Sequence, residues 1–184
     1  MNTYFPDPTR PRPVLPGEYP LWEEALGLVN RDLAATLPDQ EPLRLMALPA
    51  WDDGDGLDGA RGEDLYVTMA NGEWQGNCLE ASAENGHADA VASLADAVAS
   101  LADAVASVAD AAQETVSELL WQAWPVCGEH GLGMHSRVTD GEVAWWCSGG
   151  RSPREPEHIR AAVGALDTLG RPHRPNRKQR RRER

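Results

Sequence analysis

A seven-residue repeat of apolar and acidic positions is the clearest pattern in this sequence, and it fills residues 88–112. Val or Leu recurs at alternating spacings of three and four, Ala fills the flanks, and one Asp in each repeat falls on the opposite side. Such spacing is typical of an amphipathic helix with one apolar seam. Because Pro125 cannot continue a helix, we predict one long helix over residues 87–124. The seam consists of Val91, Leu94, Val98, Leu101, Val105 and Val108.

The repeat has two interpretations, and the sequence leaves both open. In the first, the seam is a surface for self-association or for a protein partner, because small Ala flanks let two helices approach closely. In the second, the repeat is an expansion in GC-rich coding sequence that lengthens a helix without giving it a partner. The flanking positions whose charges fix partner and register in ordinary coiled coils are Ala here.

A shorter amphipathic helix is predicted nearer the N-terminus, from Pro20 to just before Pro38. Proline is well tolerated in the first turn of a helix, and apolar residues then recur at spacings of four, three and four. These apolar residues are Trp22, Leu26, Val29 and Leu33. Residues 1–18 contain five Pro and little apolar periodicity, which indicates an extended arm.

Two strand-like runs separate these helices. Leu43–Pro49 alternates apolar and other residues, and Asp64–Asn77 contains Asn71-Gly72, a dipeptide typical of tight hairpin turns. We therefore expect a small antiparallel sheet between the two helices.

Charge is distributed unevenly along the chain. The formal net charge is −12, but Arg171–Arg184 contains seven Arg, one Lys and one Glu and so carries +7, which leaves −19 for residues 1–170. A basic tail attracts nucleic acid and an acidic body repels it. With two Pro and no large apolar residue, the tail is expected to be disordered when free and to bind nucleic acid weakly and without sequence preference.

The N-terminus lacks the basic start and apolar run of a signal peptide, and no apolar stretch reaches the roughly 18 residues of a membrane helix. We therefore expect a cytoplasmic protein with no membrane partner. Thiols stay reduced in that compartment, so cysteines close to histidines favour metal chemistry over disulfides.

Two of the three Cys and several His cluster after the long helix. Cys127 and His130 form a C-x-x-H pair around a glycine-containing turn, which suits one half of a zinc site. Asp140-Gly141 then predicts a hairpin in which His135 lies opposite Trp146 and Cys147 lies opposite Met134. Cys147 at the base of this hairpin is the third candidate ligand, as in a zinc ribbon.

The fourth ligand is left open between His135 and His158. Residues opposite one another share a face of a hairpin, so His135 and Cys147 are predicted on opposite faces, which argues mildly against His135. His158 lies ten residues beyond Cys147, after a stretch rich in Gly and Pro.

The stretch "WPVCGEHGLGMH…DGEVAWWC…HIRAAVGAL" resembles the C-terminal segments of small uncharacterised actinobacterial proteins. Those segments open with Trp-Pro-x-Cys-x-x-His, continue with a Trp-Trp-Cys strand and a later His, and end with Val/Ile-Gly-x-Leu. The resemblance covers roughly residues 119–169 and implies a zinc-ribbon-like module. It matches Cys127, His130 and Cys147 directly, and His158 if "RSPREPE" is an insertion. It implies no reaction and no partner.

Together these patterns predict an α+β fold: a small antiparallel sheet with an N-terminal helix, one long Ala-rich heptad helix, and a C-terminal zinc-ribbon-like hairpin. Five regions follow along the chain: a Pro-rich arm (1–18), a small α+β region (19–86), the heptad helix (87–124), the zinc-ribbon-like module (125–170) and the Arg-rich tail (171–184).

The expected function is non-catalytic binding or assembly, with a structural zinc ion. Glu129, the only acidic residue within the C-x-x-H turn, is expected to point away from the ligands, and the chain has no phosphate-binding loop, nucleophile elbow or H-E-x-x-H helix. Two alternatives stay open: a nucleic-acid-associated protein that acts through its tail, and a metal-dependent enzyme.

Overall fold

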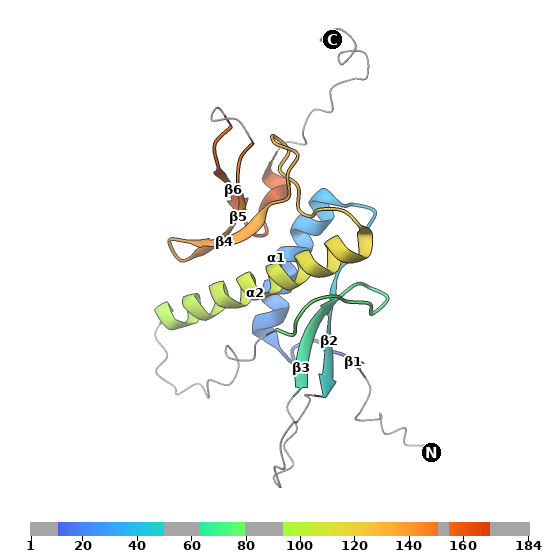
Figure 1. Ribbon diagram of the computed structural model, residues 1–184. Coiled ribbons are helices and arrows are strands. Elements are labelled where there is room, and N and C mark those ends of the chain that lie inside the picture. The colour runs from blue at the N-terminus through green and yellow to red at the C-terminus, as the bar shows by residue number, and fades with distance from the viewer. Residues whose placement is uncertain (1–10, 50–62, 80–93, 151–154, 170–184) are drawn as a thin grey trace, which may run out of the picture.

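The computed structural model describes residues 11–49, 63–79, 94–150 and 155–169 of the chain, and for residues 94–100 the backbone alone (Figure 1). The predicted α+β class is confirmed: two α-helices and two three-stranded antiparallel sheets, β1-β2-β3 and β4-β5-β6. In chain order the elements are β1 (Arg12–Pro13), α1 (Pro20–Thr36), β2 (Arg44–Pro49), β3 (Glu63–Thr68), α2 (Leu94–Leu120), β4 (His135–Thr139), β5 (Glu142–Cys147), β6 (His158–Ala162) and the short 3-10 helix η2 (Leu166–Thr168).

Helix α1 begins at Pro20, as predicted from the apolar stripe. The carboxylate of Glu23 accepts hydrogen bonds from the main-chain N–H groups of Gly17 and Tyr19, which satisfies donors at the start of the helix. The predicted stripe is buried, and Asp32 is buried with it.

The first sheet places β2 between β1 and β3, with Leu45 opposite Val67. Asn71-Gly72 forms a turn, closed by a 2.8 Å hydrogen bond from the N–H of Met69 to the carbonyl of Glu73. The expected second strand is missing after this turn, because the chain rejoins β3 only at an isolated bridge between Leu65 and Leu79.

The segment after the turn is held by α2 instead. The hydroxyl of Thr115 lies 3.0 Å from the carbonyl oxygens of both Val67 and Gln75, and it accepts a hydrogen bond from the N–H of Gln75. One buried hydroxyl thus joins α2 to β3 and to the segment after the turn.

Helix α2 lies between the two sheets and crosses α1 (Figure 1). It ends at Leu120, earlier than the predicted end at residue 124, and Trp121 then adopts a left-handed φ of 53°. Residues 87–93, which the prediction included, are outside the described part of the chain. At about 1.5 Å per residue, the 27 residues of α2 span roughly 40 Å.

Part of the heptad seam packs inside the chain itself. Val105 and Val108 are buried, and Leu101 is half-buried against the same core. Val91 and the side chains of Leu94 and Val98 lie outside the described part of the chain.

The second sheet has the hairpin register that Asp140-Gly141 predicts. Val138 lies opposite Val143 and His135 lies opposite Trp146, with positive φ values at both turn residues. Strand β5 is central, and β6 pairs along its other edge.

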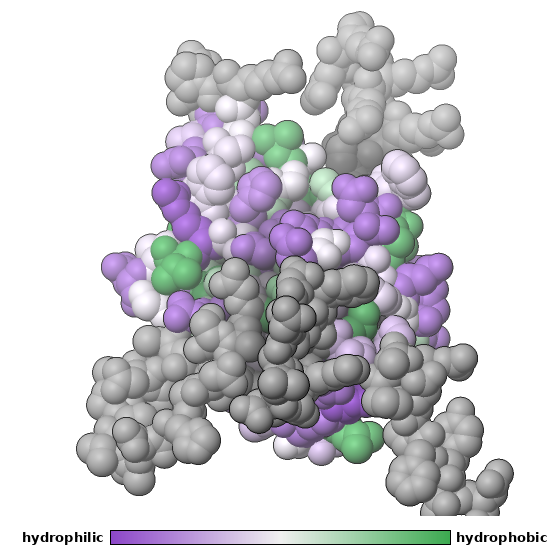
Figure 2. Space-filling model, turned by 60° about the horizontal axis from the view of Figure 1, so that its bottom comes forward, coloured by the Kyte–Doolittle hydropathy of each residue, from purple (hydrophilic) through white to green (hydrophobic). Residues whose placement is uncertain are grey.

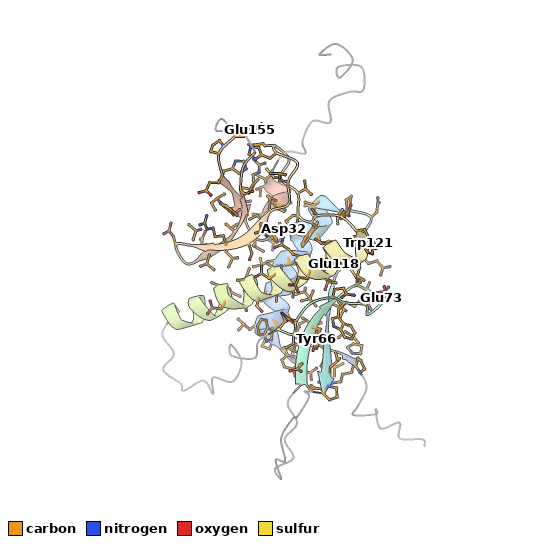
Figure 3. All side chains as sticks on the ribbon, in the orientation of Figure 1. Asp32, Tyr66, Glu73, Glu118, Trp121 and Glu155 are labelled. Carbon is orange, nitrogen blue, oxygen red and sulfur yellow. The ribbon has the colours of Figure 1, made fainter. Side chains whose placement is uncertain are left out.

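Asp32 links α1 to the second sheet from within the core, and Figure 3 shows it between them. Its carboxylate accepts hydrogen bonds from the indole Nε1 of Trp145 (2.6 Å) and from the N–H groups of Gly164 (2.6 Å) and Leu166 (2.7 Å). Burial raises the pKa of Asp32, while these three donors act in the opposite direction. Asp32 was not among the residues predicted from the sequence to be important.

Gly164 permits this close approach. Its φ is 89°, and a Cβ there would lie 2.9 Å from the side chain of Leu28 on α1. A larger residue would push the segment after β6 away from Asp32.

Within the described residues, no helix is both long enough and apolar enough to cross a membrane.

Asp32→Ala should lower the free energy of unfolding by about 3 kcal/mol or more, because it leaves three buried N–H donors without an acceptor. Asp39→Ala is the matched control, since Asp39 is exposed and its loss should cost under about 0.5 kcal/mol. Chemical denaturation at equal metal content measures both variants. Equal stability of the two would contradict the assigned role of Asp32.

Candidate metal centre

A tight loop between α2 and β4 presents the first two candidate ligands. The N–H of Cys127 bonds to the carbonyl of Leu132, and the N–H of Gly131 bonds back to the carbonyl of Cys127, both at 2.8 Å. Gly131 has a φ of 67°, which favours glycine. The loop closes on itself and brings Cys127 and His130 close to each other, as the C-x-x-H spacing predicts.

The second pair comes from neighbouring strands. Cys147 ends β5, His158 begins β6, and the two residues lie directly opposite each other in the antiparallel pairing. Opposite residues of an antiparallel pair point to the same side of the sheet. This pairing therefore brings His158 beside Cys147.

Between β5 and β6, the chain turns back at Gly149 and Gly150. The N–H of Gly150 bonds to the carbonyl of Glu155 at 2.8 Å, and a Cβ on Gly149 would lie 2.3 Å from that same oxygen. Glycine is needed at Gly149 both for its φ of 77° and for this contact.

The four side chains Cys127, His130, Cys147 and His158 form a cluster that could hold a metal ion, with their ligand atoms all within 4.8 Å of one another. Cys127 Sγ lies 3.4 Å from His158 Nε2 and 3.8 Å from His130 Nδ1. Cys147 Sγ lies 3.4 Å from His130 Nδ1. Tetrahedral zinc, with bonds of about 2.3 Å to sulfur and about 2.0 Å to nitrogen, requires separations of about 3.3–3.8 Å.

The cluster lies partly within the core, because both Cys are buried and both His are half-buried. Burial raises the pKa of the Cys147 thiol, and a hydrogen bond from the N–H of Gly149 acts against that rise. A thiolate in such surroundings needs a nearby positive charge, which a coordinated metal ion supplies.

His135 is not part of the cluster. It is exposed on β4, and its ring centroid lies 6.4 Å from that of Trp146. His158, the alternative fourth ligand, is the one that the structure places with the other three. His135 is excluded because it lies opposite Trp146, so its side chain is on the other face of the sheet from that of Cys147.

Glu129 does not point away from the ligands, so that expectation was wrong. One carboxylate oxygen lies 3.7 Å from Nδ1 of His158, and the other accepts a hydrogen bond from Arg160. The sequence contained no signal for this, because the partners lie on a strand about thirty residues away.

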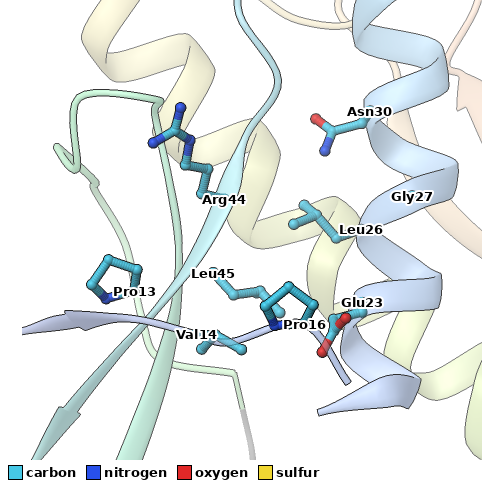
Figure 4. Close-up of a pocket in the computed structure, with 9 residues that line it drawn as sticks. All are labelled: Pro13, Val14, Pro16, Glu23, Leu26, Gly27, Asn30, Arg44 and Leu45. Carbon is cyan, nitrogen blue, oxygen red and sulfur yellow. The ribbon is translucent and has the colours of Figure 1, made fainter. Parts of the chain in front are cut away.

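A pocket of about 290 Å³ lies apart from the metal cluster, between α1 and the first sheet (Figure 4). Two of its polar residues are already used for structure: the Asn30 amide bonds to the main chain of Leu43, and Glu23 accepts main-chain N–H groups. The lining comprises Pro13, Val14, Pro16, Glu23, Leu26, Gly27, Asn30, Arg44 and Leu45. We therefore assign no chemistry to this pocket.

No family model, curated protein or solved structure matches the chain. The resemblance to small actinobacterial proteins stays a prediction from the motifs.

His158→Ala should weaken metal binding by more than the roughly 10–100-fold that loss of a supporting contact costs, because it removes one of four ligands. His135→Ala is the matched control and should leave affinity unchanged. Competition with a chromophoric chelator measures both. Weaker binding in the His135 variant, with the His158 variant normal, would show that the fourth ligand is misassigned.

Proposed function

We propose that this chain is a non-catalytic binding or assembly protein whose C-terminal sheet is stabilised by a structural zinc ion. The observation that carries the proposal is the convergence of two Cys and two His from three separate segments. A tetrahedral set of two sulfur and two nitrogen donors is typical of zinc. A cytoplasmic location, where the thiols stay reduced, is part of the proposal.

The number of protein ligands favours a structural role over a catalytic one. Four side chains fill a tetrahedral site, whereas catalytic zinc keeps one position open for water or substrate. The acidic residue beside the cluster, Glu129, is paired with Arg160 and faces His158. It is therefore engaged in holding the site and is poorly suited to act as a general base.

Metal binding would couple segments that are far apart in the sequence. It would join the loop that carries Cys127 and His130 to the end of β5 and the start of β6. Since such a site does not exist in the unfolded chain, its binding energy contributes directly to folding. The zinc ion is therefore proposed to fix the position of β6 against β5.

Exposed apolar side chains support a binding role. On the face shown in Figure 2, hydrophobic residues appear as separate patches among hydrophilic ones. Trp121 is 90% exposed directly after α2, and tryptophan is enriched among the residues that dominate binding energy at interfaces. Among the residues that the structure describes, the exposed large apolar ones are Leu15, Trp121, Val126, Leu132, Val138 and Ile159.

We propose self-association only through the first part of the heptad seam. Val105 and Val108 are already buried in the chain's own core, so another helix reaches them only if that core opens. Self-association through the heptad repeat would therefore use the earlier seam positions, which are Val91, Leu94, Val98 and the half-buried Leu101.

The purified chain should contain one zinc ion, and Cys127→Ser should lose it and expose β5 and β6 to rapid amide hydrogen exchange. Cys78→Ser is the matched control, because Cys78 is a half-buried thiol outside the cluster. Elemental analysis and hydrogen exchange measure the two effects. Wild-type protein without zinc, together with unchanged stability of the Cys127 variant, would refute the proposal.

Nucleic-acid association is a second candidate, favoured by the distribution of charge. Residues 171–184 carry +7, whereas residues 1–170 carry −19. In this alternative, the Arg-rich tail contacts phosphates and the acidic body does not.

A mobility-shift titration with single-stranded and duplex DNA tests this candidate, with a chain ending at Gly170 as the comparison. Binding by the full chain should fall by about 0.7–0.9 log units per log unit of salt for each phosphate contact, and it should disappear in the shortened chain. Negligible binding by both chains at low salt eliminates the candidate.

A further inference from the structure

The two ring nitrogens of His158 have different surroundings. Nε2 lies 3.4 Å from Cys127 Sγ and belongs to the metal cluster. Nδ1 lies 3.7 Å from a carboxylate oxygen of Glu129. The ring thus has a thiol on one side and a negative charge on the other.

This arrangement selects one form of the imidazole. A neutral histidine carries its proton on one ring nitrogen and binds a metal through the other. A carboxylate beside Nδ1 stabilises the tautomer with the proton on Nδ1, which leaves the lone pair of Nε2 directed at the cluster. At 3.7 Å the carboxylate oxygen is too far from Nδ1 for a direct hydrogen bond, so Glu129 acts through the attraction of its charge for the Nδ1–H dipole.

Arg160 fixes the carboxylate in this place. It lies two residues after His158 on β6, where the pairing with β5 is irregular, and its guanidinium contacts the same carboxylate that faces His158. Its guanidinium donates to one oxygen of Glu129, and the other oxygen is left to face His158. The side chain of Arg160 is 19% exposed and that of Glu129 is 58% exposed, so the less exposed group anchors the more exposed one.

The contact of Glu129 with His158 and Arg160 joins the ligand loop to β6. It lies between Cys127 and His130 in the ligand loop, whereas its partners lie on β6. The contact therefore connects the two halves of the ligand set.

We propose that Glu129 is a positioning residue for the metal site: its carboxylate, held by Arg160, orients His158 so that Nε2 faces the metal ion. This inference rests on the proposed zinc site and extends it beyond the four ligands. Carboxylates that support metal-bound histidines in this way set ligand orientation and basicity.

The test is zinc affinity of the full chain, measured by competition with a chromophoric chelator. Glu129→Ala and Glu129→Gln should each raise the dissociation constant by about 10–100-fold, because both remove the charge that faces Nδ1 of His158, and the glutamine variant does so while the side-chain shape is kept. Glu157→Ala is the matched control: Glu157 is exposed, is next to His158 in sequence, and makes no ion pair among the described residues. It should leave the constant unchanged.

A spectroscopic readout separates positioning from general stability. In zinc-loaded wild type, ring nitrogen shifts should report the proton of His158 on Nδ1, and in Glu129→Ala this proton should exchange faster with water. If the alanine variant does not fold, Arg160→Gln takes its place, with an expected loss in the same direction.

The outcomes are distinct. Wild type that binds zinc, with Glu129→Ala as tight as wild type, overturns the role of Glu129 and leaves the zinc site standing. Equal losses in the Glu129 and Glu157 variants also overturn it, because a general charge effect then explains the result. Wild type that binds no zinc overturns the proposed function itself.

Discussion

The buried carboxylate of Asp32 is the constraint on which the position of the C-terminal sheet depends. It receives three N–H donors, one from the Trp145 side chain on β5 and two from the main chain just after β6. A carboxylate removed from water is costly unless its oxygens are hydrogen-bonded. The sheet must therefore lie where these three N–H groups can reach the carboxylate of Asp32 on α1. A second hydrogen bond, from the indole of Trp124 to the hydroxyl of Thr36, supports the same placement.

In the proposed metal-bound chain, the metal site and Asp32 hold β6 at its two ends. His158 begins the strand within the cluster, whereas Gly164 lies two residues beyond its last residue and bonds to Asp32. β6 is a short edge strand, and short strands are weakly stable on their own. Anchors at both ends fix its register on β5, and that register is what puts His158 opposite Cys147.

Local patterns in the sequence predicted the elements that depend on local interactions. The stripe through Trp22 and Leu33 predicted α1, and Asp140-Gly141 predicted the pairing of β4 with β5. The C-x-x-H spacing predicted that Cys127 and His130 would converge. Each of these depends on residues that are close together in the chain, so periodicity and turn chemistry were sufficient.

Features that depend on contacts between distant parts of the chain could not be predicted from periodicity and turn chemistry. The choice of His158 depends on how the chain closes at Gly149, and the role of Glu129 depends on a strand that comes later. Asp32 was also missed, although a signal existed: an acidic residue directly beside Leu33 on the apolar side of a helix requires buried donors. The heptad spacing was correct for a helix, but it does not distinguish an internal core from an external partner, and Val105 and Val108 belong to the core.

X-ray absorption at the zinc edge of the purified chain tests the proposed ligand set most strictly. We expect two sulfur atoms at about 2.3 Å from the zinc ion and two nitrogen atoms at about 2.0–2.1 Å, with the more distant signals of two imidazole rings. A shell of oxygen and nitrogen only, or one containing a single sulfur, would contradict the closed ligand set of Cys127, His130, Cys147 and His158.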